Sequence, residues 1–355
     1  MIAVTDQLGH VTSYTYDDYR RVKSVTPPVR GLGDNGTYTT YFYYDVNGTG
    51  DDYTLTDSNV TWVTLPSGKR TKTVYDDNRR KLSVTVAPGT ADEATTSYGY
   101  DNVGNLTSVT SPGGHWIATV YDERNRPSSV NDRGLVTTFT YDTAGHRKSI
   151  TRPNTEVITY DTFDAMNRVT QQTATQSPDP AATTKFTYYG PNQGQPVGLL
   201  KTMQDPRLSS GTEAYTYTYD LMGRKQTITY PRPQPSATPT SEQFNYDTAG
   251  RLYQFINRNG KTQTFSYDAL NRMTGFSWND GLTPSVSFGY DAASRLASLI
   301  NANANISRIY YNDNLLRSET ESITGGRAKT TTYAYDADGN RATTQYPDNY
   351  TFNYT

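Results

Sequence analysis

The dipeptide Tyr-Asp occurs twelve times in this 355-residue chain. This recurrence constrains the fold more than any other feature, because a repeated sequence unit implies a repeated supersecondary unit. Neighbouring copies such as Asp122 and Asp142, or Asp247 and Asp268, lie about twenty residues apart, a spacing typical of repeat architectures. We therefore expect a tandem array of small units.

Each copy stands in a common frame: Tyr-Asp and two further residues are followed by Gly or Asn, and then by a polar residue, often Arg. The frame predicts a single array over residues 1–355, with about thirteen units and an incomplete unit at each end. The residues expected to anchor the repeats structurally are Tyr16, Asp17, Tyr141, Asp142, Gly145, Tyr219, Asp220, Gly223, Tyr246, Asp247, Gly250, Tyr267, Asp268, Tyr290, Asp291, Tyr335, Asp336 and Gly339.

The segment before each Tyr-Asp pair alternates with a period of two, as in 215–219, where Tyr and Thr alternate. Alternating aromatic and β-branched residues are the signature of a strand. Asp is the favoured first residue of a type I turn, and Gly or Asn accepts the left-handed conformation that follows. Each unit thus predicts a β-hairpin in which Asp caps the turn, and no segment shows the periodicity of a helix.

A lone hairpin is marginal in water, whereas neighbouring hairpins can pair their strands and bury their rings against one another. Strand twist then coils the sheet. The predicted fold class is all-β: tandem hairpins in a continuous, spirally coiled antiparallel sheet. Two Pro-rich stretches, near 176–183 and 231–240, interrupt the period and predict surface loops, because Pro cannot pair within a central sheet.

Composition gives little support for catalysis, metal binding or nucleic-acid binding. The net charge of -2 lacks the basic excess of nucleic-acid-binding proteins, Cys is absent, and no apolar run is long enough to span a membrane. The three His residues, His10, His115 and His146, lie at or beside turn Gly residues and form no zinc-binding pattern. We predict no catalytic residue and no cofactor.

One segment has the alternating oxygen ligands with which a calcium loop begins, namely Asp45, Asn47 and Asp51. The twelfth position, where such a loop carries a bidentate Glu, is Thr56. A polar turn explains the segment more simply, so the calcium site is the weaker interpretation.

The motif Y-D-x-x-[G/N]-[R/N]-[L/V], preceded by G-x-x-T-x-[Y/F]-x, closely resembles the RHS or YD repeats. That family includes bacterial Rhs polymorphic toxins, the C components of insecticidal toxin complexes, wall-associated repeat proteins and animal teneurins. The resemblance implies a sheet that forms part or all of a hollow β-shell, which in the toxin members encloses a C-terminal effector. The D-P-x-G segment at which those members cleave themselves has no match here, since Asp205-Pro206 stands in another context.

The resemblance implies a non-catalytic structural protein, bacterial and either secreted or attached to the cell surface, although no signal peptide is visible at the N-terminus. Its expected partners are the remaining repeats or the toxin cargo of a longer protein, with self-association through sheet edges as a further expectation. The alternative is an adhesion or carbohydrate-binding scaffold that uses outward Tyr, Trp and loop residues, with glycans or cell-surface molecules as partners.

Overall fold

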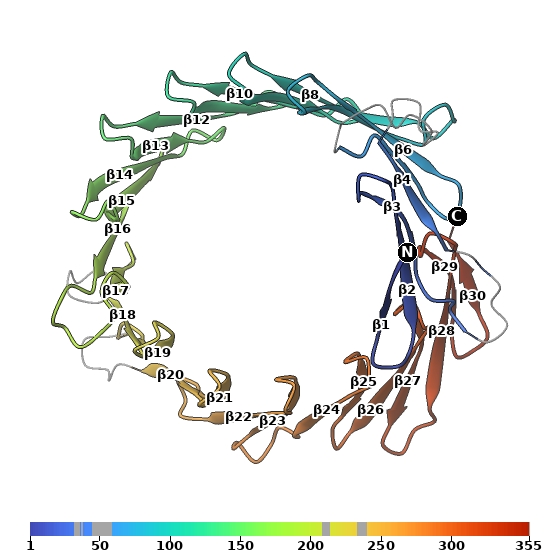
Figure 1. The fold of residues 1–355 in the computed structure, drawn as a ribbon. Helices are drawn as coiled ribbons and strands as arrows, with labels where there is room; N and C mark the ends of the chain where they lie inside the picture. The colour runs from blue at the N-terminus through green and yellow to red at the C-terminus, as the bar shows by residue number, and fades with distance from the viewer. Residues whose placement is uncertain (32–35, 37, 45–58, 208–213, 233–239, 355) are drawn as a thin grey trace. The chain divides into compact units, whose positions relative to one another are not determined.

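The structure is a computed structural model that describes residues 1–31, 36, 38–44, 59–207, 214–232 and 240–354. The chain divides into two compact units. Unit 1 comprises residues 1–100, 108–115 and 284–355, and unit 2 comprises residues 101–107 and 116–283. Hairpins of the predicted kind fill both units (Figure 1). The existence of one array over 1–355 stays a prediction.

The strands of unit 1 come from both ends of the chain. They are β1 (Ile2–Thr5), β2 (Val11–Tyr16), β3 (Val22–Thr26), β4 (Thr40–Tyr43), β5 (Trp62–Thr64), β6 (Arg70–Tyr75), β7 (Lys81–Val86), β8 (Ala94–Tyr100), β24 (Val286–Tyr290), β25 (Leu296–Ile300), β26 (Ala304–Tyr310), β27 (Leu316–Ile323), β28 (Lys329–Tyr335), β29 (Arg341–Gln345) and β30 (Thr351–Asn353). Strand β9 (Leu106–Thr110) contributes residues to both units.

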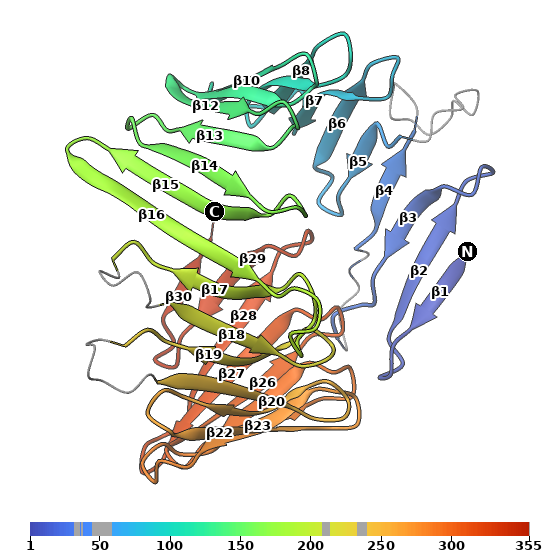
Figure 2. The same cartoon turned by 90° about the vertical axis from the view of Figure 1, so that its left-hand side faces the viewer.

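Unit 2 is formed by the middle of the chain, and its consecutive strands lie side by side in chain order (Figure 2). They are β10 (Trp116–Tyr121), β11 (Pro127–Asp132), β12 (Leu135–Tyr141), β13 (Arg147–Thr151), β14 (Val157–Phe163), β15 (Val169–Gln176), β16 (Asp179–Tyr188), β17 (Leu200–Gln204), β18 (Tyr215–Tyr219), β19 (Lys225–Thr229), β20 (Ser241–Tyr246), β21 (Leu252–Ile256), β22 (Thr262–Tyr267) and β23 (Met273–Trp278).

The described residues contain no helix, and the strands within each unit pair antiparallel, so the predicted all-β fold is confirmed. Hairpin β18–β19 represents the rest: Tyr217 pairs with Ile228, Thr218 with Thr227 and Tyr219 with Lys225. The register shifts by one residue between Thr218 and Tyr219. Such a bulge sharpens the local twist, and the same shift recurs before the Tyr of other repeats.

The two faces of the sheet differ in chemistry. One face carries cross-strand ring pairs, such as Phe244 with Phe255, whose centroids are 5.2 Å apart. The other face carries paired hydroxyls, such as Thr218 and Thr227, whose oxygens are 2.7 Å apart. Both kinds of pair follow from the alternation of aromatic residues with Thr, and both stabilise neighbouring strands.

Few side chains in this sheet are deeply buried. Among the described apolar and aromatic residues, the core consists of Tyr189 and Tyr219, with 6% and 7% of their surface exposed. Stability must therefore come chiefly from contacts between successive hairpins, as in other repeat proteins. No described segment forms a helix suited to crossing a bilayer.

The loop predicted at 176–183 is wrong in part. Residues of this stretch form the far end of hairpin β15–β16, where Gln176 pairs with Asp179 and Ala174 with Ala182. Pro180 is tolerated because β16 pairs with β17 only from Lys185 onward, so one side of the strand is unpaired at the proline. Of the second stretch, residues 233–239 lie outside the described part of the chain.

Candidate functional site

The predicted anchors form a repeated turn whose geometry is clear at Asp247. The Asp247 carboxylate accepts the N–H of Arg251 at 2.9 Å, and its carbonyl accepts the N–H of Gly250 at 2.9 Å. Gly250 has a φ of +87°, the left-handed region that favours glycine. The carboxylate thus holds the turn closed through main-chain hydrogen bonds.

Other Tyr-Asp turns, and the turn at Phe163-Asp164, have the same geometry. In each, the Asp carboxylate accepts the N–H of the residue four positions later. This is so for Asp17, Asp76, Asp101, Asp122, Asp142, Asp164, Asp220, Asp268, Asp291 and Asp336.

The Arg four residues after Asp links its own turn to the next hairpin. Arg251 Nε donates to Asp247 at 2.8 Å, and its guanidinium lies 4.7 Å from the ring centroid of Tyr267, which ends strand β22. Arg251 Nη1 also donates to the Asn271 side chain of the following turn, at 3.0 Å. A planar, permanently charged guanidinium can make all these contacts together, whereas Lys cannot.

The stacking contact recurs with guanidinium-to-ring distances of 4.0 to 4.7 Å. In each pair the ring belongs to a Tyr of the next hairpin, at the end of a strand or, for Tyr44, directly after it. The pairs are Arg21 with Tyr44, Arg80 with Tyr100, Arg126 with Tyr141, Arg168 with Tyr188, Arg224 with Tyr246 and Arg295 with Tyr310.

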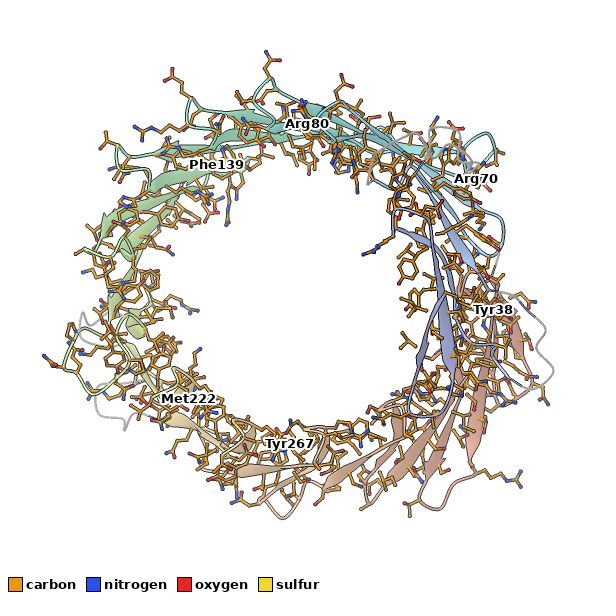
Figure 3. All side chains as sticks on the ribbon, in the orientation of Figure 1. Tyr38, Arg70, Arg80, Phe139, Met222 and Tyr267 are labelled. Carbon is orange, nitrogen blue, oxygen red and sulfur yellow. The ribbon has the colours of Figure 1, made fainter. Side chains whose placement is uncertain are left out.

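The strand-ending Tyr returns a hydrogen bond to the preceding hairpin. The Tyr267 hydroxyl, on the residue labelled in Figure 3, donates to the carbonyl of Leu252 at 2.8 Å. Leu252 directly follows Arg251, so ring and hydroxyl bind the same corner of the neighbouring hairpin. Equivalent bonds are made by Tyr44, Tyr75, Tyr121, Tyr141, Tyr188, Tyr219, Tyr310 and Tyr335.

We call this set of contacts the interlock: the Asp carboxylate, the Arg four residues later, and the Tyr of the next hairpin with its hydroxyl bond. The turn residue with positive φ is part of it. A Cβ added to Gly250 would lie 3.0 Å from Nη1 of Arg224, so glycine leaves room for the arginine of the preceding hairpin. Asn271 occupies the same position and accepts a hydrogen bond from Arg251 instead.

Two hairpins replace the charged pair with apolar groups. At 188–199, Tyr189 stands in the place of Asp and Leu199 in the place of Arg. The Tyr189 hydroxyl donates to the carbonyl of Tyr217 at 2.7 Å, and its ring meets Tyr219 edge-on. At 311–315, Tyr311 and Leu315 repeat this arrangement against Tyr333 and Tyr335. Neither stretch carries the Tyr-Asp motif.

Within unit 1 an ion pair joins residues far apart in sequence. Arg30 Nε donates to Asp313 at 2.6 Å, and both side chains are nearly buried. Arg30 also donates to the carbonyl of Tyr335 and stacks on Tyr38. Nearby, the hydroxyl of Ser67 bonds to Asp338.

A cavity of about 320 Å³ adjoins these contacts, and Arg30, Tyr38, Asp313 and Leu315 are among its lining residues. Arg30 and Asp313 on its wall are bonded to each other. This part of unit 1 therefore fastens two distant segments together.

Two of the three histidines occupy the place of Arg. His10 Nδ1 lies 3.0 Å from Asp6, and His146 Nδ1 lies 2.8 Å from Asp142. His115 follows a glycine turn, where its carbonyl accepts the N–H of Ser111. In the described part of the chain, no three His, Asp or Glu residues are grouped as a metal site would need. The calcium-loop candidates Asp45, Asn47 and Asp51 lie outside the described residues.

The electrostatics agree with this geometry. Hydrogen bonds from the Arg126 side chain and main chain lower the pKa of Asp122 to about 2. Burial raises the pKa of Tyr219, because a phenolate would be poorly solvated there. The Asp122 carboxylate is thus held charged and the Tyr219 phenol neutral.

Reasoning from sequence alone missed the role of Arg. Asp was expected to cap its own turn, and the structure adds that it also fixes the arginine that reaches the next hairpin. A signal was present in the sequence, since Arg follows the turn Gly or Asn in many copies. The number of residues between each Arg and the next Tyr varies with loop length, so the sequence did not show which Tyr each Arg contacts.

Comparison with known proteins identifies the repeat. Residues 89–115, 121–157 and 246–275 match the family model described as RHS Repeat. These three stretches of the chain are therefore RHS repeats. No curated protein matches the sequence significantly.

Solved structures share the fold. The TcdB2-TccC3 crystal structure matches with a TM-score of 0.73 and 13% identity, over 96% of this chain and 18% of the other. A Photorhabdus luminescens Tc holotoxin pore matches with a TM-score of 0.70 and 14% identity, over 96% and 18%. TcdB2-TccC3-Cdc42 matches with a TM-score of 0.68 and 14% identity, over 95% and 20%. The chain spans about a fifth of the length of these chains, and identities this low show the fold alone.

Proposed function

We propose that the chain is a non-catalytic wall segment of a secreted β-shell whose cargo is an effector. The observation that carries the proposal is the interlock, which recurs from hairpin to hairpin in both units. Its Asp, Arg and Tyr residues are the ones that recur in the sequence, and they bind one another. The likeness in fold to chains of a Tc holotoxin supports a place in such an assembly.

The ion pair between Arg30 and Asp313 would serve this function by fastening the wall. Removing one partner of a buried ion pair leaves the other charge buried and unpaired. This typically lowers the free energy of unfolding by about 3 to 5 kcal/mol. We expect Arg30→Ala to let the fastened segments separate. Arg327→Ala is the matched control, because Arg327 is exposed.

Limited digestion with proteinase K tests this fastening. Wild type and Arg327→Ala should resist equally, while Arg30→Ala should be cut sooner between residues 27 and 31. Equal resistance of all three proteins would argue against a fastening role for Arg30.

Enclosure of cargo needs a separate experiment on the natural polypeptide that carries this chain. Segments outside the repeats should resist proteinase K until denaturant opens the repeats. Digestion of those segments at the rate seen when they are expressed alone would refute enclosure.

A glycan-binding scaffold would use outward Tyr, Trp and loop residues. The strand-ending tyrosines that carry the interlock instead bind main-chain carbonyls, so we favour the structural role. Saturable binding on a glycan array, lost when exposed Trp116 is replaced, would favour the scaffold.

A further inference from the structure

One interlock in unit 2 uses histidine in place of arginine. His146 lies four residues after Asp142. Its main-chain N–H donates to one oxygen of the Asp142 carboxylate at 2.8 Å, and its ring Nδ1 lies 2.8 Å from the other oxygen. Its ring stacks on Phe163, with centroids 4.5 Å apart and planes inclined by 22°. Phe163 ends strand β14, the place that Tyr occupies in other repeats.

Asn167 lies in the following turn, at the position that Asn271 holds for Arg251, and its side chain acts with Asp142 to raise the pKa of His146. His146 thus joins hairpin β12–β13 to hairpin β14–β15 by two of the contacts that Arg makes elsewhere: a carboxylate on its own turn and a ring on the next hairpin. The hairpin that carries it contains Phe139, labelled in Figure 3.

We propose that His146 makes the junction between β12–β13 and β14–β15 a pH-sensitive seam, tight when the imidazole is protonated and loose when it is neutral. An imidazolium has a positive charge, which attracts the Asp142 carboxylate, and an N–H donor on each ring nitrogen, one of which can donate toward Asn167. A neutral ring has one donor and no charge, so one contact weakens and the attraction to Asp142 is lost. Arginine junctions keep their charge at every physiological pH.

The charged groups around the seam favour protonation. Asp142 faces the ring from its own turn. The preceding turn brings Arg126, which is itself paired with Asp122, and the following turn brings Arg168, paired with Asp164. Asp142 is therefore the carboxylate available to the imidazolium, while the neighbouring charges are matched in pairs.

The direction of the effect follows from the histidine. Hydrogen bonding to Asp142 raises the pKa of His146 above its ordinary value. A pKa raised by folding contributes stability that is fully present below the unfolded value of about 6.5. That stability is lost as the pH rises through the higher value of the folded state, so the seam loosens toward neutral and alkaline pH.

Hydrogen exchange on the whole chain tests the seam. In wild type, amides of β13 and β14 should lose protection between pH about 5.5 and about 8, by about threefold after correction for intrinsic rates. His146→Arg should keep full protection at both values, and His146→Gln should show low protection at both. His115→Gln is the control and should keep the wild-type dependence.

Titration by nuclear magnetic resonance supplies a second readout. The His146 ring should titrate above the ordinary pKa of about 6.5. A pKa at or below that value, or a pH dependence that persists in His146→Arg, would overturn the proposal. Arginine is what other repeats carry at this position, so the variant is expected to fold.

Discussion

Replacing Tyr219 with Phe isolates one hydroxyl bond between neighbouring hairpins. Tyr219 is 7% exposed, and its hydroxyl donates to the carbonyl of Leu200 at 2.9 Å. Tyr219→Phe keeps the ring and its edge-on contact with Tyr189 but removes the donor. Loss of one such hydrogen bond lowers the free energy of unfolding by about 1 kcal/mol. The loss can reach about 2 kcal/mol when the buried carbonyl is left without a donor.

The control is Tyr253→Phe, the same chemical change on a side chain that is 40% exposed. Its effect should stay within about 0.5 kcal/mol, as for other surface substitutions. Tyr219→Ala should cost more, about 3 to 5 kcal/mol, because it also leaves a cavity.

Urea unfolding measures these differences from the shift of the midpoint at unchanged slope. Wild type must first show coincident transitions by fluorescence and circular dichroism, since repeat arrays can unfold in parts. Equal midpoints for Tyr219→Phe and Tyr253→Phe would show that the hydroxyl bond adds nothing to the stability of the contact between these two hairpins.

Two further predictions concern the turns. Gly250→Ala should destabilise more than Gly260→Ala: both glycines have positive φ, but a new Cβ at Gly250 meets Arg224 at 3.0 Å whereas Gly260 has open space. Each should lose about 1 kcal/mol from backbone strain, and only Gly250→Ala should lose more, as urea midpoints would reveal. The pKa of Asp122 falls from 3.8 to about 2 on folding, so its stabilisation is present above pH 3.8 and is lost as the pH falls through about 2. Calorimetry should show a decline of Tm across this range that is shallower in Asp122→Asn, and equal declines would contradict the assignment.

Local residue chemistry made the hairpins predictable. Alternation over 215–219 predicts strand β18, and Asp220 with Gly223 predicts its turn, because both depend on neighbours in sequence. The same holds for the two faces of the sheet. The motif therefore predicts the unit well.

Contacts between units were harder to predict. The partner of Arg251 is Tyr267, whose position depends on the length of the intervening strands and loop. The pair of Arg30 and Asp313 joins residues 283 positions apart, and no local pattern marks either one. Pro180 within a strand likewise depends on where the neighbouring strand ends. These features depend on how distant segments pack together, which the spacing of residues along one sequence does not reveal.

Hydrogen exchange on Arg251→Ala gives the most direct test of whether the interlock joins one hairpin to the next. If Arg251 couples hairpins, amides of β22 and β23, which lie beyond its own turn, should exchange faster than in wild type. If faster exchange is confined to residues 247–251, Arg251 only closes its own turn, and the interlock does not couple neighbouring hairpins.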